Sequence, residues 1–185
     1  MYYGDIKNCD AANGPGVRIS LFVSGCTHKC KGCFNEATWD FCYGDPYGQE
    51  QEDKIIELLR PSYITGLTVL GGEPMEPQNQ PEVLKLLRRV RKEFGDSKSI
   101  WVYSGYLFDK DIVGRMFNEV PETKELISLV DVMMDGPFVL ELLDKTLYFR
   151  GSSNQRAIDV PATIADNYNI HIWEPHVPKY IYSNT

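Results

Sequence analysis

Short apolar runs alternate with longer amphipathic stretches along this chain, and that alternation limits its fold more than any other feature. Four apolar, partly β-branched runs predict strands at about 17–23, 67–70, 99–103 and 130–134. Two stretches with apolar residues at helical spacing predict helices at about 52–59 and 80–94, and a further helical stretch after 106 is broken near Pro121. Strand–helix alternation is typical of parallel strands joined by right-handed crossovers. The sequence therefore predicts an α/β fold with mainly parallel strands.

Each predicted strand is followed by a segment that suits a binding site. These segments are a loop that begins at Cys26, Gly71-Gly72-Glu73-Pro74, Ser104-Gly105 and Asp135-Gly136. Ligands of barrels and open α/β sheets gather at the carboxyl ends of parallel strands. We therefore expect these four segments to meet in one site.

Three cysteines, Cys26, Cys30 and Cys33, lie in one segment of the sequence with the spacing C-x3-C-x2-C. Thiolates this close can serve one metal centre. Three protein ligands on a four-iron cluster leave one iron free to bind another molecule, whereas a closed electron carrier uses four cysteines. The alternatives are a zinc site, with His28 or a distant residue as fourth ligand, and three unrelated thiols. Zinc loops usually carry a second C-x2-C pair, which this sequence lacks, so the spacing favours iron and sulfur.

The segment Gly71-Gly72-Glu73-Pro74 has a similar double interpretation. Two glycines at the end of a strand let the backbone approach a ligand closely, because no Cβ stands in the way. The Glu73 side chain can accept hydrogen bonds from an ammonium group. An ordinary strand-to-helix turn explains the same residues, but the turn becomes more specific together with the cysteine loop.

The cysteine spacing and the Gly-Gly-Glu-Pro turn together resemble the radical S-adenosylmethionine (SAM) superfamily. Further matching segments occur in order, at Asn13–Arg18, Leu21–Gly25, Pro77–Asn79, Trp101–Tyr106 and Arg150–Gln155. Over about residues 1–156 the chain resembles the branch whose members activate the anaerobic ribonucleoside-triphosphate reductase, a glycyl radical enzyme. The wider superfamily usually has an aromatic residue before the third cysteine, whereas this chain has Gly32 there and Phe34 after it, as in that branch. Either Phe34 or the backbone at Gly32 would then meet the adenine.

The resemblance implies a partial, incomplete radical SAM βα barrel and an oxidoreductase that activates a glycyl radical enzyme. Cys26, Cys30 and Cys33 would hold a [4Fe–4S] cluster as the catalytic and metal-binding residues, with SAM on the open iron. The residues expected to contact SAM are Gly32, Cys33, Phe34, Gly71, Gly72, Glu73 and Ser104. A low-potential donor such as flavodoxin would supply the electron that cleaves SAM. The resulting 5′-deoxyadenosyl radical would take a hydrogen from a glycine of the reductase.

The chain is too short for a closed eight-fold barrel, which typically needs about 250 residues. We expect residues 1–156 to form the activase domain and residues 157–185 to form a C-terminal extension, an extended segment that packs on its surface. A partial barrel leaves its side open, which suits a substrate that is a loop of another protein.

Charge and cysteine usage indicate a cytoplasmic protein that binds neither nucleic acid nor membrane. The net charge is −7, and the one basic run, Lys85–Lys92, fits a solvated helix face. The N-terminus lacks the layout of a signal peptide, and no apolar run reaches membrane-spanning length. Five cysteines, an odd number and mostly clustered, favour reducing conditions.

Two other functions fit part of the sequence. One is the activation of a different glycyl radical enzyme, of the pyruvate formate-lyase type, but Gly32 counts against it because those relatives carry the aromatic residue at that position. The other is a non-enzymatic zinc or iron–sulfur binding module, in which the Gly-Gly-Glu-Pro turn has no role.

Overall fold

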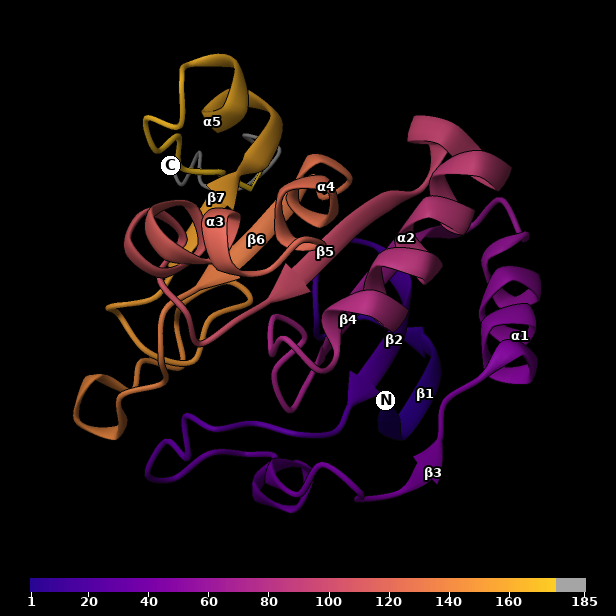
Figure 1. Ribbon diagram of the computed structural model, residues 1–185, viewed down its shortest axis with the longest axis horizontal. Helices are drawn as coiled ribbons and strands as arrows, with labels where there is room; N and C mark the ends of the chain where they lie inside the picture. Colours follow the sequence, from indigo (N-terminus) through magenta and orange to yellow (C-terminus); the bar gives the residue numbers. More distant parts are fainter. Residues whose placement is uncertain (176–185) are drawn as a thin grey trace, which may run out of the picture.

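The computed structural model describes residues 1–175, and a single seven-stranded sheet forms its centre. The strand order is β3-β1-β2-β4-β5-β6-β7 (Figure 1). The strands are β1 (Tyr2–Asp10), β2 (Val17–Val23), β3 (Asp45–Pro46), β4 (Ile64–Gly71), β5 (Ser99–Tyr103), β6 (Val132–Asp135) and β7 (Arg156–Asp159). The α-helices are α1 (Gln49–Leu59), α2 (Gln80–Phe94), α3 (Phe117–Glu119), α4 (Thr123–Ser128) and α5 (Val160–Ala165). A π-helix (Phe108–Met116) precedes α3, and 3-10 turns occur at Glu36–Trp39, Gly95–Ser97 and Leu140–Leu142.

The four central strands run parallel, as the sequence predicts. β2 pairs with β4, β4 with β5, and β5 with β6, all in parallel register. Antiparallel strands flank this centre, because β1 pairs with β2 and β3, and β7 pairs with β6. The sheet is therefore mixed, with the predicted parallel strands in the middle, and the fold is α/β.

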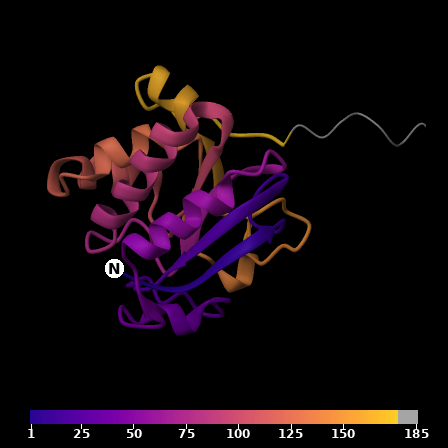
Figure 2. The ribbon, with the colours of Figure 1, turned by 90° about the vertical axis from the view of Figure 1, so that its right-hand side faces the viewer.

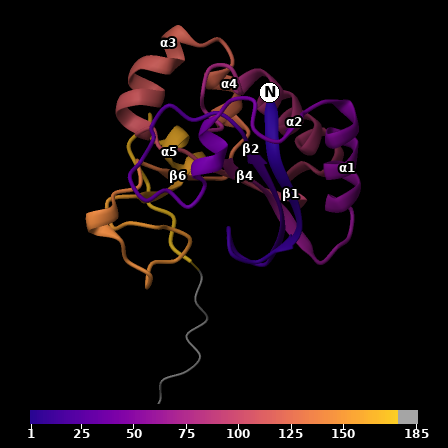
Figure 3. The same cartoon turned by 90° about the horizontal axis from the view of Figure 1, so that it is seen from below.

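Helices α1 and α2 cover one face of the sheet, the segment between β6 and β7 lies on the opposite face, and the segment between β2 and β3 lies beyond the carboxyl ends of the parallel strands (Figures 2 and 3). Strand β2 shows why. Its residues Ile19, Leu21 and Val23 are fully buried in the main hydrophobic core beneath the helices. The alternate residues Arg18 and Phe22 point to the opposite face, since successive side chains of a strand alternate.

Helix α2 contributes an apolar stripe to this core and a charged face to solvent. Its inward residues are Val83, Leu84, Leu86, Leu87 and Val90. Of its outward basic residues, Arg88 pairs with Glu125 of α4 and Arg89 pairs with Asp53 of α1. The basic run of the sequence therefore lies on a solvated helix face that neighbouring carboxylates partly neutralise.

Several predicted bounds hold and others shift. The bounds of β2, α2 and β5 match the predicted ranges, whereas α1 begins earlier, at Gln49, and β4 begins at Ile64. The strand expected at 130–134 lies at Val132–Asp135 instead. Strand β1 was not predicted, because Ile6 is the only buried residue within it and the strand therefore shows no apolar alternation.

The segment after residue 156 differs from the extended surface segment that the sequence suggested. Strand β7 crosses the expected boundary, since it runs from Arg156 to Asp159, and α5 follows it directly. Residues 171–173 then return beside β7, where Ile172 pairs with Ile158. The division into 1–156 and 157–185 stays a prediction, and residues 176–185 lie outside the described part. Among residues 1–175, the helices are all too short or too polar to cross a membrane.

Candidate active site

A cavity of about 520 Å³ opens at the carboxyl ends of the parallel strands, where the sequence places the site. The predicted residues that line it are Cys26, Cys30, Cys33, Phe34, Gly71, Gly72, Glu73 and Ser104. Gly32 is not among the lining residues, and a Cβ there would lie 3.2 Å from the side chain of Leu140. Of the two residues considered for contact with an adenine, the structure thus brings Phe34 to the cavity.

The cysteine loop leaves β2 and folds back on the segment around Trp39. The backbone N–H of Gly25 donates to the carbonyl of Thr38 at 2.8 Å, and that of Cys26 donates to the carbonyl of Trp39 at 3.2 Å. Gly25 has a φ of +96°, and a Cβ on it would lie 2.2 Å from the ring of Phe41. Only glycine fits this turn, which directs the loop across the cavity.

The three cysteines of this loop reach the cavity from different depths. Cys26 is buried, and Cys30 and Cys33 are partly exposed. Burial raises the pKa of Cys26 to about 11 and also raises the pKa of Cys30. The backbone N–H of Asn35 lies 3.4 Å from Sγ of Cys33. Such donors to cysteine sulfur tune the potential of iron–sulfur clusters.

The donor set fits a cluster better than a single ion. Within residues 1–175, no three His, Cys, Asp or Glu side chains converge as the ligands of one metal ion would. A tetrahedral zinc site needs four ligands around one point. The thiolates of a [4Fe–4S] cluster bind different iron atoms and therefore stand apart. Cys9 and Cys42 are exposed and do not line the cavity.

The Gly-Gly-Glu turn after β4 is hydrogen-bonded to the end of β2 and to the start of the cysteine loop. The N–H of Gly72 donates to the carbonyl of Val23 at 2.7 Å, and the N–H of Glu73 donates to the carbonyl of Gly25 at 2.8 Å. A Cβ on Gly72 would lie 2.7 Å from the carbonyl oxygen of Gly25. The absent Cβ of Gly72 thus lets the backbone of the cysteine loop come close, and the predicted contact of Gly72 with SAM stays a prediction.

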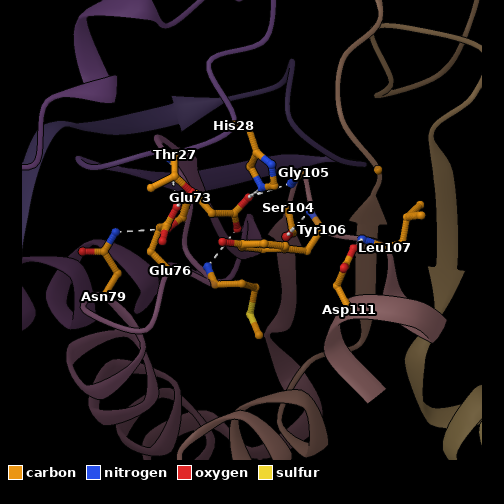
Figure 4. A network of polar contacts seen from close by, with 12 residues as sticks. Thr27, His28, Glu73, Glu76, Asn79, Ser104, Gly105, Tyr106, Leu107 and Asp111 are labelled. Atoms are coloured by element: carbon orange, nitrogen blue, oxygen red, sulfur yellow. Dashed lines mark hydrogen bonds and ion pairs between the residues drawn. The ribbon is translucent and has the colours of Figure 1, made fainter. Parts of the chain in front are cut away.

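The carboxylate of Glu73 joins three loops (Figure 4). This side chain is 1% exposed. One oxygen accepts a hydrogen bond from the N–H of Gly105 at 2.7 Å and lies 3.1 Å from Nε2 of His28, and the other accepts from the N–H of Met75 at 2.9 Å. A carboxylate has about four acceptor positions, so protein donors fill most of them. Glu73 therefore fixes the loops around the cavity, and its contact with an ammonium group of SAM stays a prediction.

His28 belongs to this network rather than to the cysteine ligands. Burial lowers the pKa of His28, but the hydrogen bond and charge of Glu73, with the charges of Glu76 and Asp111, outweigh it and hold the pKa above its usual value. The ring also packs edge-on against Tyr106, with centroids 4.3 Å apart. Its Nε2 faces Glu73, and among residues 1–175 His28 does not join two other potential ligands at one metal position.

Two further polar contacts around the turn were not predicted. A carboxylate oxygen of Glu76 accepts from the backbone N–H of Thr27 at 2.8 Å. The amide of Asn79 donates to the carbonyls of Ser24 and Glu73, each at 3.0 Å (Figure 4). Both side chains follow the turn within one short stretch of sequence. Polar residues this close to a predicted site were the only signal in the sequence, because their burial is known only from the structure.

The far part of the cavity holds polar groups without protein partners. The hydroxyl of Tyr103 and Nε1 of Trp39 are buried, line the cavity and have no hydrogen-bond partner among the described residues. Buried polar atoms are normally satisfied, so these two atoms are exceptions within the part of the chain that the structure describes. Lys7 and Arg150, which also line the cavity, add positive charge.

Arg18 lies within the sheet, away from the cavity. It is fully buried and does not line the cavity. It donates to Oγ1 of Thr68 and to the carbonyl of Leu67, each at 2.7 Å, and to the carbonyl of Ser99 at 2.9 Å. Burial lowers its pKa to about 10. Arg18 thus ties β2 to β4 and β5 without an ion pair among residues 1–175.

Comparisons with known proteins show the family of this chain. The family described as "4Fe-4S single cluster domain" matches residues 12–158. The anaerobic ribonucleoside-triphosphate reductase-activating protein of Escherichia coli K12 is 42% identical over 157 residues, which is 84% of this chain and 96% of that protein. The protein of the same name from Vibrio cholerae is 43% identical over 158 residues, with the same shares covered. The one from enterobacteria phage T4 is 41% identical over 156 residues, 84% of this chain and 92% of that protein.

Proposed function

Since the chain belongs to the family of anaerobic ribonucleoside-triphosphate reductase-activating proteins, and to that of the 4Fe-4S single cluster domains, we propose that it activates an anaerobic ribonucleoside-triphosphate reductase as a radical SAM enzyme. The observation that carries this proposal is the meeting of the three loop cysteines with the Gly-Gly-Glu turn around one cavity. A closed electron carrier would need a fourth cysteine, and Cys9 and Cys42 lie outside the cavity.

In this proposal Cys26, Cys30 and Cys33 would hold the [4Fe–4S] cluster, and the iron left without a protein ligand would be the place for SAM. When bound, the reduced cluster supplies the electron that cleaves SAM into methionine and a 5′-deoxyadenosyl radical, which abstracts a hydrogen from a glycine of the reductase. The protein's own part is to bind, orient and exclude side reactions.

The described residues suit that part in three ways. Glu73 locks the cysteine loop to the turn and to the loop after β5 through His28 and Gly105. The exposed Phe34 and the buried Ser104 border the space left for SAM. The positive charge of Lys7 and Arg150 favours a ligand that carries a carboxylate.

A protein substrate fits the shape of the molecule. The strand order runs from β3 to β7 without closing, which supports a partial rather than a complete barrel. Exposed apolar side chains stand beside the cavity, among them Phe34, which is 79% exposed. A segment of the reductase could therefore reach the cavity from the open side, and a low-potential protein such as flavodoxin would supply the electron.

The test is to mix the anaerobically reconstituted protein with the reductase, SAM and a low-potential reductant. A glycyl radical doublet should appear in the electron paramagnetic resonance spectrum of the reductase, and methionine and 5′-deoxyadenosine should accumulate with it. Omission of SAM, or the variant Cys30→Ala, should remove both signals. Rapid SAM cleavage that leaves the reductase without a radical would contradict the partner and leave the chemistry standing.

The same assay also tests whether the partner is another glycyl radical enzyme instead of the reductase. The same assay with a pyruvate formate-lyase should give no doublet, because the residue before Cys33 is Gly32 rather than an aromatic residue. A doublet in that enzyme alone would favour the alternative partner.

A further inference from the structure

Trp173 lies beyond residue 158, where the match to the cluster-domain family ends, yet it packs close to the cavity. Its segment returns along the outer edge of β7. The N–H of Trp173 donates to the carbonyl of Ala157 at 2.8 Å, and the N–H of Asp159 donates to the carbonyl of His171 at 2.9 Å. These two hydrogen bonds fix the backbone from which the indole ring extends.

The indole ring joins an aromatic cluster on the cavity side of the sheet. It meets the ring of Trp101 edge-on, with centroids 4.8 Å apart, and lies 6.3 Å from the ring of Phe149. Trp101 and Phe149 are also edge-on, at 5.5 Å. Trp101 is 2% exposed and is held from below by Arg18, whose guanidinium carbon lies 5.3 Å from the ring centroid. Phe149 therefore packs against Trp101, which is buried, and against Trp173.

Phe149 is the member of this cluster that reaches the cavity. Its φ is +58°, in the left-handed region, although it is not a glycine. A residue with a Cβ pays about 1–2 kcal/mol for this conformation, which persists only where its surroundings enforce it. The backbone after it is held by Gln155, which accepts from the N–H of Gly151 at 2.9 Å. Its ring is held by the two tryptophans.

We infer that Trp173 is a positioning residue that holds Phe149 in the cavity wall and thereby strengthens the binding of the adenosine part of SAM. This inference rests on the proposed function for the identity of the ligand. The ligand has one flat aromatic group, its adenine, and Phe149 is an aromatic residue that lines the cavity. Contact between a base and an aromatic side chain is a substantial and general source of affinity.

The experiment compares variants of the cluster-loaded, full-length protein in anaerobic titration calorimetry with SAM. Trp173→Ala should weaken SAM binding by about fivefold, the value of one lost aromatic pair. Trp173→Phe should restore most of the affinity. Ile172→Ala is the matched control, because the Ile172 side chain lies in the same segment, is 53% exposed and should leave the affinity unchanged.

A double-mutant cycle separates positioning from general damage. Phe149→Ala should weaken SAM binding about as much as Trp173→Ala, and the double variant should be no weaker than either, since both remove the same contact. Binding of methionine alone, which lacks the adenosine, should be the same in all variants. An equal loss of methionine binding would overturn the inference, as would an unchanged SAM affinity in a folded Trp173→Ala protein.

A second readout needs no SAM at all. Hydrogen exchange at the amides of residues 147–151 should be faster in Trp173→Ala than in Ile172→Ala, because the ring that holds Phe149 is gone. If the parent protein does not bind SAM, the proposed function fails, and the exchange rates alone decide whether Trp173 positions this wall. Equal rates in the two variants would refute it. If Trp173→Ala does not fold, Trp173→Leu keeps an apolar side chain and replaces it in both measurements.

Discussion

Nε2 of His28 lies 3.1 Å from the buried carboxylate of Glu73, and this contact joins the cysteine loop to the turn after β4. The same carboxylate oxygen accepts the N–H of Gly105 from the loop after β5. Three segments that are distant in sequence therefore share one buried acceptor. The walls of the cavity depend on this acceptor before any ligand arrives.

Replacement of this acceptor should destabilise the protein. Glu73→Gln keeps the size of the side chain but turns an amide NH2 group toward protein donors, which should cost about 1–3 kcal/mol. Thermal unfolding should show the loss as a lower midpoint, by about 2–4 °C for each kcal/mol. Glu57→Gln breaks only the exposed ion pair with Arg60 and should leave the midpoint nearly unchanged. Equal midpoints for the two variants would contradict this role of Glu73.

Iron content should depend on three of the five cysteines. Reconstitution should give about four irons per chain, and the Ala variants of Cys26, Cys30 and Cys33 should each lose most of them. Cys9→Ala and Cys42→Ala should load normally, because both residues are exposed and away from the cavity. Iron and sulfide analysis with the visible absorption spectrum measures this. Stoichiometric zinc without iron uptake would show that the site is not a cluster.

Gly72 should be required for cluster binding as well as for SAM binding. A Cβ at this position would lie 2.7 Å from the carbonyl oxygen of Gly25 and 2.8 Å from that of Thr38, and neither backbone atom can move without moving the cysteine loop. Gly72→Val should therefore lower iron content and SAM affinity together. Gly48→Ala is the control, since the nearest atom to its new Cβ would be 3.7 Å away. Normal iron with weak SAM binding would instead mean that Gly72 faces the ligand alone.

Gly105 and His28 should be coupled by a steric contact. A Cβ on Gly105 would lie 2.5 Å from Cδ2 of His28, so Gly105→Ala should displace the ring and lower the unfolding midpoint. His28→Ala removes the ring, at the cost of its contact with Glu73. The double variant should then be more stable than the sum of the two single losses predicts. Strict additivity would show that the ring moves away freely.

The sequence predicts the parallel centre of this fold well, because buried strands and amphipathic helices have characteristic spacings of apolar residues. Ile19, Leu21 and Val23 alternate with Arg18 and Phe22, and the structure places the two sets on opposite faces. Strand β1 escapes such reasoning, because its pairing is made by backbone groups and only Ile6 is buried.

Part of the site could likewise be predicted from the sequence, and part could not. The cysteines and the turn could be located because their chemistry depends on residue type and spacing. The partners of Glu73 could not, since the contact with Gly105 uses a backbone N–H and spans 32 positions. The proposed role of Phe149 in the cavity wall depends on its contact with Trp173, near the end of the described residues. No local sequence pattern predicts a contact between these two residues.

The three predicted cluster ligands lie in one short loop, and none of them belongs to the main hydrophobic core under the helices. If the proposed function holds, loss of a cluster to oxygen would empty this loop while the sheet and its core keep their own contacts. Such a protein would be restored by delivery of a new cluster to the folded chain, without synthesis of a new chain.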